Sequence, residues 1–272
     1  IDVREPLTPI VVGHYPLVNS TQPLENVLRS PRMALAGNRG ALVDANGRLW
    51  LFSTDHPEPL QFQPGPQFQG QVTELAWGDD LQLYAVSGDD PVITAIDFRD
   101  PHRPVVLPAS PLPAKTIVHM ATLGKLVVLA CGLEGLITVD FSRPQPPRIL
   151  ALPLPINAFR VRVDGAVAVV GDGRGGLLQV DLRDRVRPRI NGLLSTQGIS
   201  DFVVAEGQAV VAVDFGGLLA VPLPQTLQTV AREKHQMTLA LPPINTAGHY
   251  TLQIADGPQT VVLPGVLALA PR

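Results

Sequence analysis

The chain has 272 residues and a formal net charge of −3, and 45% of its residues are hydrophobic. A chain of this length can bury a sizeable core, as one large domain or as one domain with a smaller one. Its few lysines and scattered arginines argue against a nucleic-acid partner, which would need clustered cations to displace counterions. No apolar run approaches the roughly 20 residues of a membrane-spanning helix, so we expect no transmembrane segment.

The first fifteen residues read as the second half of a repeated unit. Ile1 and Asp2 have the pattern of a strand end, residues 4–9 form a proline-marked turn, and Ile10–Tyr15 predicts the next strand. We therefore expect the chain to begin inside a repeat and to be part of a larger protein. The strands that complete this repeat come either from upstream residues or from elsewhere in the chain.

The same unit recurs between residues 33 and 223. Two apolar strands, separated by a glycine-containing turn, end in aspartate and run into a turn with proline, most clearly at 126–140 and 166–181. The corresponding end positions are 45, 43, 41 and 41 residues apart and carry Phe52, Asp97, Asp140, Asp181 and Pro222. A period near forty, with short strands split by Gly/Pro turns, is typical of propeller blades. We predict an all-β chain in which residues 1–236 form a β-propeller of about six four-stranded blades, the first one incomplete.

The second strand of each clear repeat is a continuous apolar run rather than an alternating one. Such runs occur at Leu126–Ala130, Ala166–Val170 and Ala209–Val213. A continuous run predicts a strand buried on both faces, as expected for a blade that lies between two others.

The aspartates that end the strands are predicted to be structural repeat anchors: Asp2, Asp97, Asp140 and Asp181. An aspartate at a strand end can accept backbone N–H groups of the following turn. A ring of carboxylates that binds a metal is the alternative, but the acidic turns lack the spacing of a calcium loop. We predict no metal site, and calcium binding in the acidic turns stays open.

The character of the sequence changes after Met237. Residues 237–272 match no repeat and predict three strands, at Thr238–Leu241, His249–Ala255 and Gln259–Leu269. Residues 247–257 resemble a hairpin of a bacterial immunoglobulin-like module. So short a segment cannot form such a sandwich alone. It is therefore either the start of a second domain or the closure of the propeller.

Motifs that carry chemistry are few. Gly171–Gly176 has the G-x-G-x-x-G spacing of a dinucleotide site, but Leu177–Leu182 is β-patterned where that site needs a helix. We predict a hairpin turn there and no cofactor. The single cysteine, Cys131, lies in an apolar run and is predicted to be a buried core residue. The histidines occur singly, at His14, His56, His102, His119, His235 and His249, so no catalytic residue is assigned.

Two stretches resemble a known family. Residues 175–182, Gly-Gly-Leu-Leu-Gln-Val-Asp-Leu, and residues 96–101, Ile-Asp-Phe-Arg-Asp-Pro, resemble the LVIVD repeat of bacterial β-propellers. The resemblance covers most of residues 1–230 and implies the propeller fold. It implies no shared catalytic set, and the chain departs from the pattern at Phe52 and Pro222.

Two functions follow as expectations. The first is a non-enzymatic binding or scaffold propeller within a larger bacterial protein, extracellular or on the cell surface, that recognises a protein or glycan partner through its loops. The alternative is a lactonase-like or glycosidase-like propeller hydrolase with a site at the central channel. The expected inner segments Phe159–Val163 and Phe202–Ala205 are poor in His, Asp, Glu and Asn, which favours binding.

Overall fold

The computed structural model describes residues 32–44, 46–55, 62–78, 81–101, 103–143, 146–154, 156–194, 198–205, 207–213, 217–223, 228–232, 237–240, 248–256 and 259–269. The regular elements in these ranges are β-strands and none is a helix, so the predicted all-β class is confirmed. The chain divides into two compact units, Ile1–Pro224 and Gln225–Arg272. Asp2 and the strand expected at Ile10–Tyr15 lie outside the described residues.

The described residues of the first unit form five antiparallel sheets, each built from strands that are consecutive in the chain. The first has β1 (Arg32–Ala36), β2 (Arg39–Val43), β3 (Arg48–Ser53) and β4 (Gln63–Gln67). The second has β5 (Val72–Trp77), β6 (Gln82–Ser87), β7 (Val92–Asp97), β8 (Val105–Val106) and β9 (Ser110–Pro111), the last two both paired with β7. The third has β10 (His119–Leu123), β11 (Leu126–Ala130), β12 (Leu136–Asp140) and β13 (Arg148–Leu152). The fourth has β14 (Ala158–Asp164), β15 (Val167–Asp172), β16 (Leu177–Asp181) and β17 (Arg189–Leu194), and the fifth has β18 (Ile199–Ala205), β19 (Gln208–Val213) and β20 (Gly217–Pro222).

The sequence repeats coincide with these sheets. Asp97, Asp140 and Asp181 are the last residues of the third strands of their sheets, and Pro222 has the same place in β20. Phe52 lies one residue before the end of β3. The repeat period therefore marks blades, as predicted.

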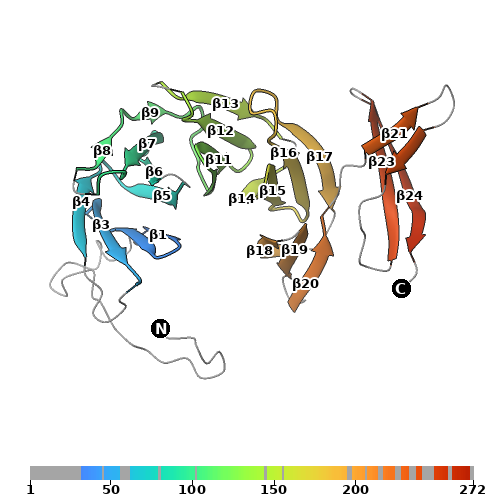
Figure 1. Ribbon diagram of the computed structural model, residues 1–272, viewed down its shortest axis with the longest axis horizontal. Helices are drawn as coiled ribbons and strands as arrows, with labels where there is room; N and C mark the ends of the chain where they lie inside the picture. The colour runs from blue at the N-terminus through green and yellow to red at the C-terminus, as the bar shows by residue number, and fades with distance from the viewer. Residues whose placement is uncertain are drawn as a thin grey trace. The chain divides into compact units, whose positions relative to one another are not determined.

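The sheets of the first unit are arranged as propeller blades. Figure 1 shows them following one another along an arc, with the first strands inside and the fourth strands outside. The first strands contact one another in order, β1 with β5, β5 with β10, β10 with β14 and β14 with β18. This is the radial stacking of antiparallel sheets that defines a β-propeller, and three of the five described sheets have four strands.

The hydrophobic core lies between successive blades. Val127 and Leu129 of β11 pack in the cluster shared with the second blade, whereas Val128 and Ala130 pack in the cluster shared with the fourth. All five residues of β11 are buried for this reason. Burying such a Val or Leu side chain stabilises the fold by roughly 1.5–3 kcal/mol each, which explains the continuous apolar runs in the sequence.

In the second unit, the part of the chain that the structure describes forms two hairpins. β21 (Gln228–Arg232) pairs with β22 (Met237–Ala240), and β23 (Gly248–Asp256) pairs with β24 (Gln259–Leu269). The domain boundary expected between residues 236 and 237 thus falls inside the first hairpin. An immunoglobulin sandwich has about seven strands, so the immunoglobulin-like character of this unit stays a prediction. The described residues contain no helix long and apolar enough to cross a membrane.

Candidate functional site

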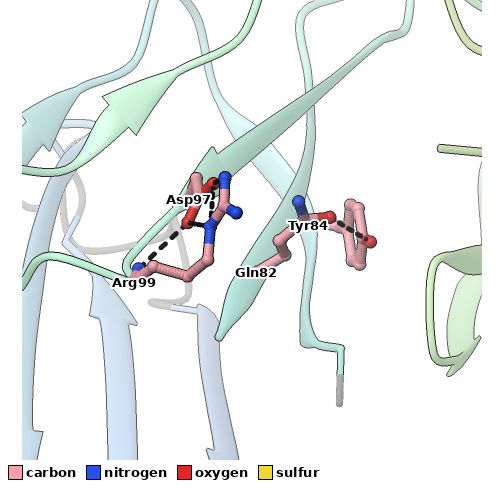
Figure 2. Close-up of polar contacts among 4 residues, drawn as sticks. All are labelled: Gln82, Tyr84, Asp97 and Arg99. Carbon is pink, nitrogen blue, oxygen red and sulfur yellow. Dashed lines mark hydrogen bonds and ion pairs between the residues drawn. The ribbon is translucent and has the colours of Figure 1, made fainter. Parts of the chain in front are cut away.

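Asp97 holds the turn that follows its strand. Its Oδ1 accepts a hydrogen bond from the backbone N of Arg99 at 2.9 Å. The Nε of Arg99 donates to the two carboxylate oxygens at 3.0 and 2.8 Å, so carboxylate and guanidinium face each other (Figure 2). The hydrogen bonds from Arg99 lower the pKa of Asp97, against the effect of burial. On the neighbouring strand the Tyr84 hydroxyl donates to Oε1 of Gln82 at 2.8 Å, a separate buried pair.

The equivalent aspartates make the same kind of turn. Oδ1 of Asp181 accepts from the backbone N of Arg183 at 2.9 Å, and the side-chain hydrogen bond from Arg183 lowers the pKa of Asp181. Oδ1 of Asp140 accepts from the backbone N of Ser142 at 2.9 Å and lies 3.5 Å from Nη1 of Arg185 on the next repeat. Burial opposes the change at Asp140, but these hydrogen bonds and nearby arginines leave its pKa lowered. The contacts are those of strand-end turns, and the importance of these aspartates for stability stays a prediction.

The glycine cluster at 171–176 is a hairpin turn between β15 and β16. Oδ1 of Asp172 accepts from the backbone N of Arg174 at 3.0 Å and from that of Asn157 at 2.9 Å. Gly175 and Gly176 have φ angles of 99° and 133°, which favour glycine. A strand follows directly, so there is no helix N-terminus to receive a pyrophosphate. The predicted turn is confirmed.

A set of polar side chains occupies one level of the inner strands. Glu74, His119, Arg160 and Asp201 lie on β5, β10, β14 and β18, and their second-strand partners are Val86, Ala130, Gly171 and Ala212. These partners are equivalent residues of the four blades, so the four side chains occupy the same position in each repeat. We call these four residues the inner polar set.

The members of the inner polar set contact groups of neighbouring blades. Oε2 of Glu74 accepts from the backbone N of Met120 at 3.2 Å. The Nε of Arg160 lies 3.1 Å from Oδ1 of Asp201. Arg162, two residues further along β14, places Nη1 3.1 Å from Nε2 of His119 and Nη2 3.6 Å from Oδ1 of Asp201. Each side chain of the set therefore meets a group from a neighbouring blade.

Burial perturbs two titratable groups of the set in opposite senses. Desolvation raises the pKa of Glu74 from 4.5 to about 7, although Arg32, the Met120 hydrogen bond and Arg160 act the other way. Desolvation, together with the charges of Arg162 and Arg160, lowers the pKa of His119 from 6.5 to about 4. At neutral pH His119 is thus uncharged, and Glu74 is partly protonated. A carboxyl with a pKa near neutrality can accept or donate a proton.

Sequence reasoning missed this set. The segments Phe159–Val163 and Phe202–Ala205 are indeed poor in acidic side chains, but the inner strands around them supply Glu74, His119 and Asp201. The available signal was the repeat itself, because the four residues lie 45, 41 and 41 positions apart. Among the described residues no three His, Cys, Asp or Glu side chains are grouped to hold a metal ion.

Cys131 takes no part in the inner polar set. Its residue is 1% exposed in the core between the second and third blades, as predicted. Burial, and next the charge of Glu134, raises the pKa of its thiol to about 12. The thiolate, which is the reactive form, is therefore negligible at neutral pH. His56 and His102 lie outside the described residues.

Comparison with known proteins identifies the fold. No family model and no curated protein matches the chain, so the LVIVD resemblance stays a prediction. A protein of unknown function from Desulfotomaculum acetoxidans superposes with a TM-score of 0.56 at 12% identity, over 67% of this chain and 62% of its own. The WD40 domain of Neurospora crassa Pan2 gives 0.55 at 13% identity, over 72% of this chain and 64% of its own. A candidate 6-phosphogluconolactonase from Bacteroides uniformis gives 0.56 at 13% identity, over 85% and 71%.

The chain spans about three fifths of the length of the first two of these structures. Sequence identities this low support a shared architecture, but they do not support a shared activity. Both a WD40 domain and a lactonase-like protein are among the similar structures, so the fold alone does not choose between the two expected functions. The chain is a β-propeller.

Proposed function

We propose that this chain is a non-enzymatic binding propeller that recognises a macromolecular partner, protein or glycan, through the turns at one rim of its blades. We place it within a larger bacterial protein that is exported or displayed at the cell surface. One observation carries the binding function, and it favours a protein partner. It is an exposed leucine on a turn that hydrogen bonds hold in place.

Leu133 lies in the turn between β11 and β12 and is 71% exposed. Gly132 in the same turn exchanges two backbone hydrogen bonds with Ala158 of the next blade, at 2.8 and 2.9 Å. Oε1 of Glu134 accepts from the backbone N of Lys115 at 3.1 Å. The turn is thus tied to the chain on both sides. Because hydrogen bonds already hold this turn, a partner that covers Leu133 orders little further backbone, and the loss of conformational entropy on binding is small.

The inner polar set supports binding over catalysis by the way its charges are used. Arg162 and Arg160 both contact the carboxylate of Asp201, and Arg162 also contacts His119. Nε of Arg162 donates to the backbone O of Phe202 at 3.2 Å, which adds another link between the fourth and fifth blades. These contacts join blades to one another, which is a structural use of inward polar groups.

The proposal is tested by comparing Leu133→Ser with a matched control, Val186→Ser. Val186 is 44% exposed and lies in the turn between β16 and β17, where its backbone N donates to Asp184 at 2.9 Å. Turns between third and fourth strands lie at the opposite rim from Leu133, because consecutive strands are antiparallel. Partners are isolated from an extract of the source organism with immobilised wild-type chain, identified, purified and titrated against all three proteins.

Leu133→Ser should weaken binding of the purified partner by roughly tenfold or more, as for a residue central to an interface. Val186→Ser should bind like the wild type. Equal affinity of all three proteins would show that the Leu133 turn is not the binding surface. Loss of binding in Val186→Ser alone would place the surface at the other rim.

The hydrolase remains the second candidate because of Glu74. A half-buried carboxyl with a pKa of about 7 is suited to general acid–base chemistry. The wild-type chain should therefore be assayed against a panel of lactones and aryl glycosides, beside Glu74→Gln. Turnover by the wild type that Glu74→Gln abolishes would overturn the non-enzymatic proposal.

A further inference from the structure

A cavity of about 480 Å³ opens between the first and second blades. It lies at the rim where third strands end, on the opposite side of the blades from Leu133. Leu51, Phe52, Leu81 and Phe98 give it apolar walls. Its volume falls within the range of small-molecule sites, which are mostly apolar with a few placed polar groups.

Two hydrogen-bond donors at this cavity have no acceptor. Nη1 of Arg39 and Nε1 of Trp77 are both buried, and neither has a hydrogen-bond partner among the described residues. The guanidinium of Arg39 lies 5.4 Å from the centre of the Trp77 ring, and both residues line the cavity. Trp77 is 8% exposed. Buried donors without acceptors are rare in folded proteins and each needs an explanation.

A second arginine–tryptophan pair in the chain shows the ordinary arrangement. Arg48 lies 5.6 Å from the centre of the Trp50 ring, at the other end of β3 and outside the cavity. There the tryptophan Nε1 donates to Oδ2 of Asp44 at 2.9 Å. The guanidinium lies at a similar distance from the ring in the two pairs, but the Trp77 indole N–H lacks the acceptor that the Trp50 indole N–H has. The lining of the cavity includes no Asp or Glu side chain.

The departure of the first blade from the repeat pattern forms one wall of this cavity. Phe52 stands where the second, third and fourth blades have Asp97, Asp140 and Asp181, and its ring lies against Gly40. Any Cβ at position 40 would collide with that ring, so glycine is required for Phe52 to lie there. At the end of β3 an aromatic ring thus takes the place of the carboxylate that ends the third strand in each of the next three blades.

We propose that this cavity binds a small organic acid, with its carboxylate on Arg39 and Trp77 and an apolar, ring-sized body against Phe52 and Phe98. Arginine and tryptophan side chains offer donors and no acceptors, so the ligand must supply the acceptor atoms. An anion is favoured because a charge-assisted hydrogen bond to arginine is stronger than a neutral one. The apolar walls favour a body without further charges.

The test uses 3-phenylpropionate and hexanoate as probes, with 3-phenylpropionamide as the neutral match. Binding is measured by ligand-observed NMR on the wild type. It is repeated by fluorescence in a Trp50→Phe background, where Trp77 is the one tryptophan left. We expect a Kd on the order of 1 mM for a ligand of about eleven heavy atoms. The amide should bind roughly tenfold more weakly than the acid.

Arg39→Gln should weaken binding of 3-phenylpropionate at least roughly tenfold, whereas the matched Arg48→Gln should leave it unchanged. If Arg39→Gln does not fold, Gln63→Glu carries the same test. It adds a negative charge to the cavity wall from the exposed strand β4 and should also abolish binding. The proposal is overturned if acid and amide bind equally, if the cavity variants bind like the wild type, or if neither acid binds at about 10 mM.

Discussion

The carboxylate of Asp97 accepts hydrogen bonds both from the backbone of its turn and from a neighbouring guanidinium. Its carboxylate accepts from the backbone N and the Nε of Arg99, and its residue is 9% exposed. Replacing such a turn acceptor leaves a backbone N–H without its partner. We therefore expect Asp97→Ala to lower the free energy of unfolding by about 1–2 kcal/mol.

Urea unfolding of Asp97→Ala checks this, with Asp90→Ala as control, since Asp90 is an exposed aspartate of the β6–β7 turn. The pKa of Asp97 is lowered by folding, so its contribution is present above about pH 4 and is lost as the pH falls further. Equal stability of Asp97→Ala and Asp90→Ala at neutral pH would contradict the anchoring role.

Glu74 and His119 give the stability of the fold opposite dependences on pH. The carboxyl of Glu74 binds its proton more tightly when folded, so its contribution is present below about pH 4.5 and is lost as the pH rises through about 7. His119 binds its proton less tightly when folded. Its contribution is present above about pH 6.5 and is lost as the pH falls through about 4. Between these limits the two effects offset each other.

Replacing either Glu74 or His119 should leave the pH dependence of stability that is due to the other residue. Glu74→Gln keeps an acceptor for the backbone N of Met120 and should become less stable on acidification from pH 7 to pH 5. His119→Gln keeps an acceptor for Arg162 and should become less stable as the pH rises over the same range. Urea midpoints at both pH values measure this. Identical slopes in the wild type and both variants would show that neither group titrates as described.

The hairpin turns differ in how closely other backbone atoms lie against their glycines. Gly135, between β11 and β12, has a φ of 84°, and a Cβ there would lie 2.6 Å from the backbone O of Leu152 and from the backbone N of Leu154. Gly165, between β14 and β15, has a φ of 54° and open space around it. Both glycines have the left-handed backbone conformation, but a side chain would collide with backbone atoms only at Gly135.

We expect Gly165→Ala to cost about 1 kcal/mol of stability, which is the price of the left-handed backbone alone. Gly135→Ala should cost about 3 kcal/mol or more, because backbone atoms must also move. Chemical unfolding of the two variants, which differ only in position, separates strain from steric collision. Similar losses in both would mean that the third blade relaxes around the added methyl group.

At the scale of the molecule, the two end blades of the described array expose apolar side chains. Met33 and Leu35 of β1 are 58% and 55% exposed, and Val203 of β18 and Val210 of β19 are 56% and 39% exposed. In the second, third and fourth blades, by contrast, the second strands β6, β11 and β15 are buried along almost their whole length. Six blades are predicted, so a further blade would cover these faces.

We predict that residues 238–272 do not supply that blade. A chain that ends at residue 237 should then melt close to the temperature of the full chain and keep the oligomeric state of the full chain. Thermal unfolding and light scattering measure this, with deletion of residues 259–272 as an intermediate. A large fall in melting temperature, or aggregation through the exposed faces, would show that the C-terminal strands close the propeller.

The amino-acid pattern alone was enough to predict the blades, the ends of their third strands and the turns that follow. These features depend on residues within a few positions of one another, as Asp97 and Arg99 do, and the same strand-end turn recurs at Asp140 and Asp181. The tertiary structure was needed to show that Glu74, His119, Arg160 and Asp201 each contact a neighbouring blade. It also showed that Phe52 replaces a carboxylate beside the buried donors of Arg39 and Trp77. Such contacts depend on how one blade stacks on the next, and that stacking is set by the whole interblade core rather than by any single repeat.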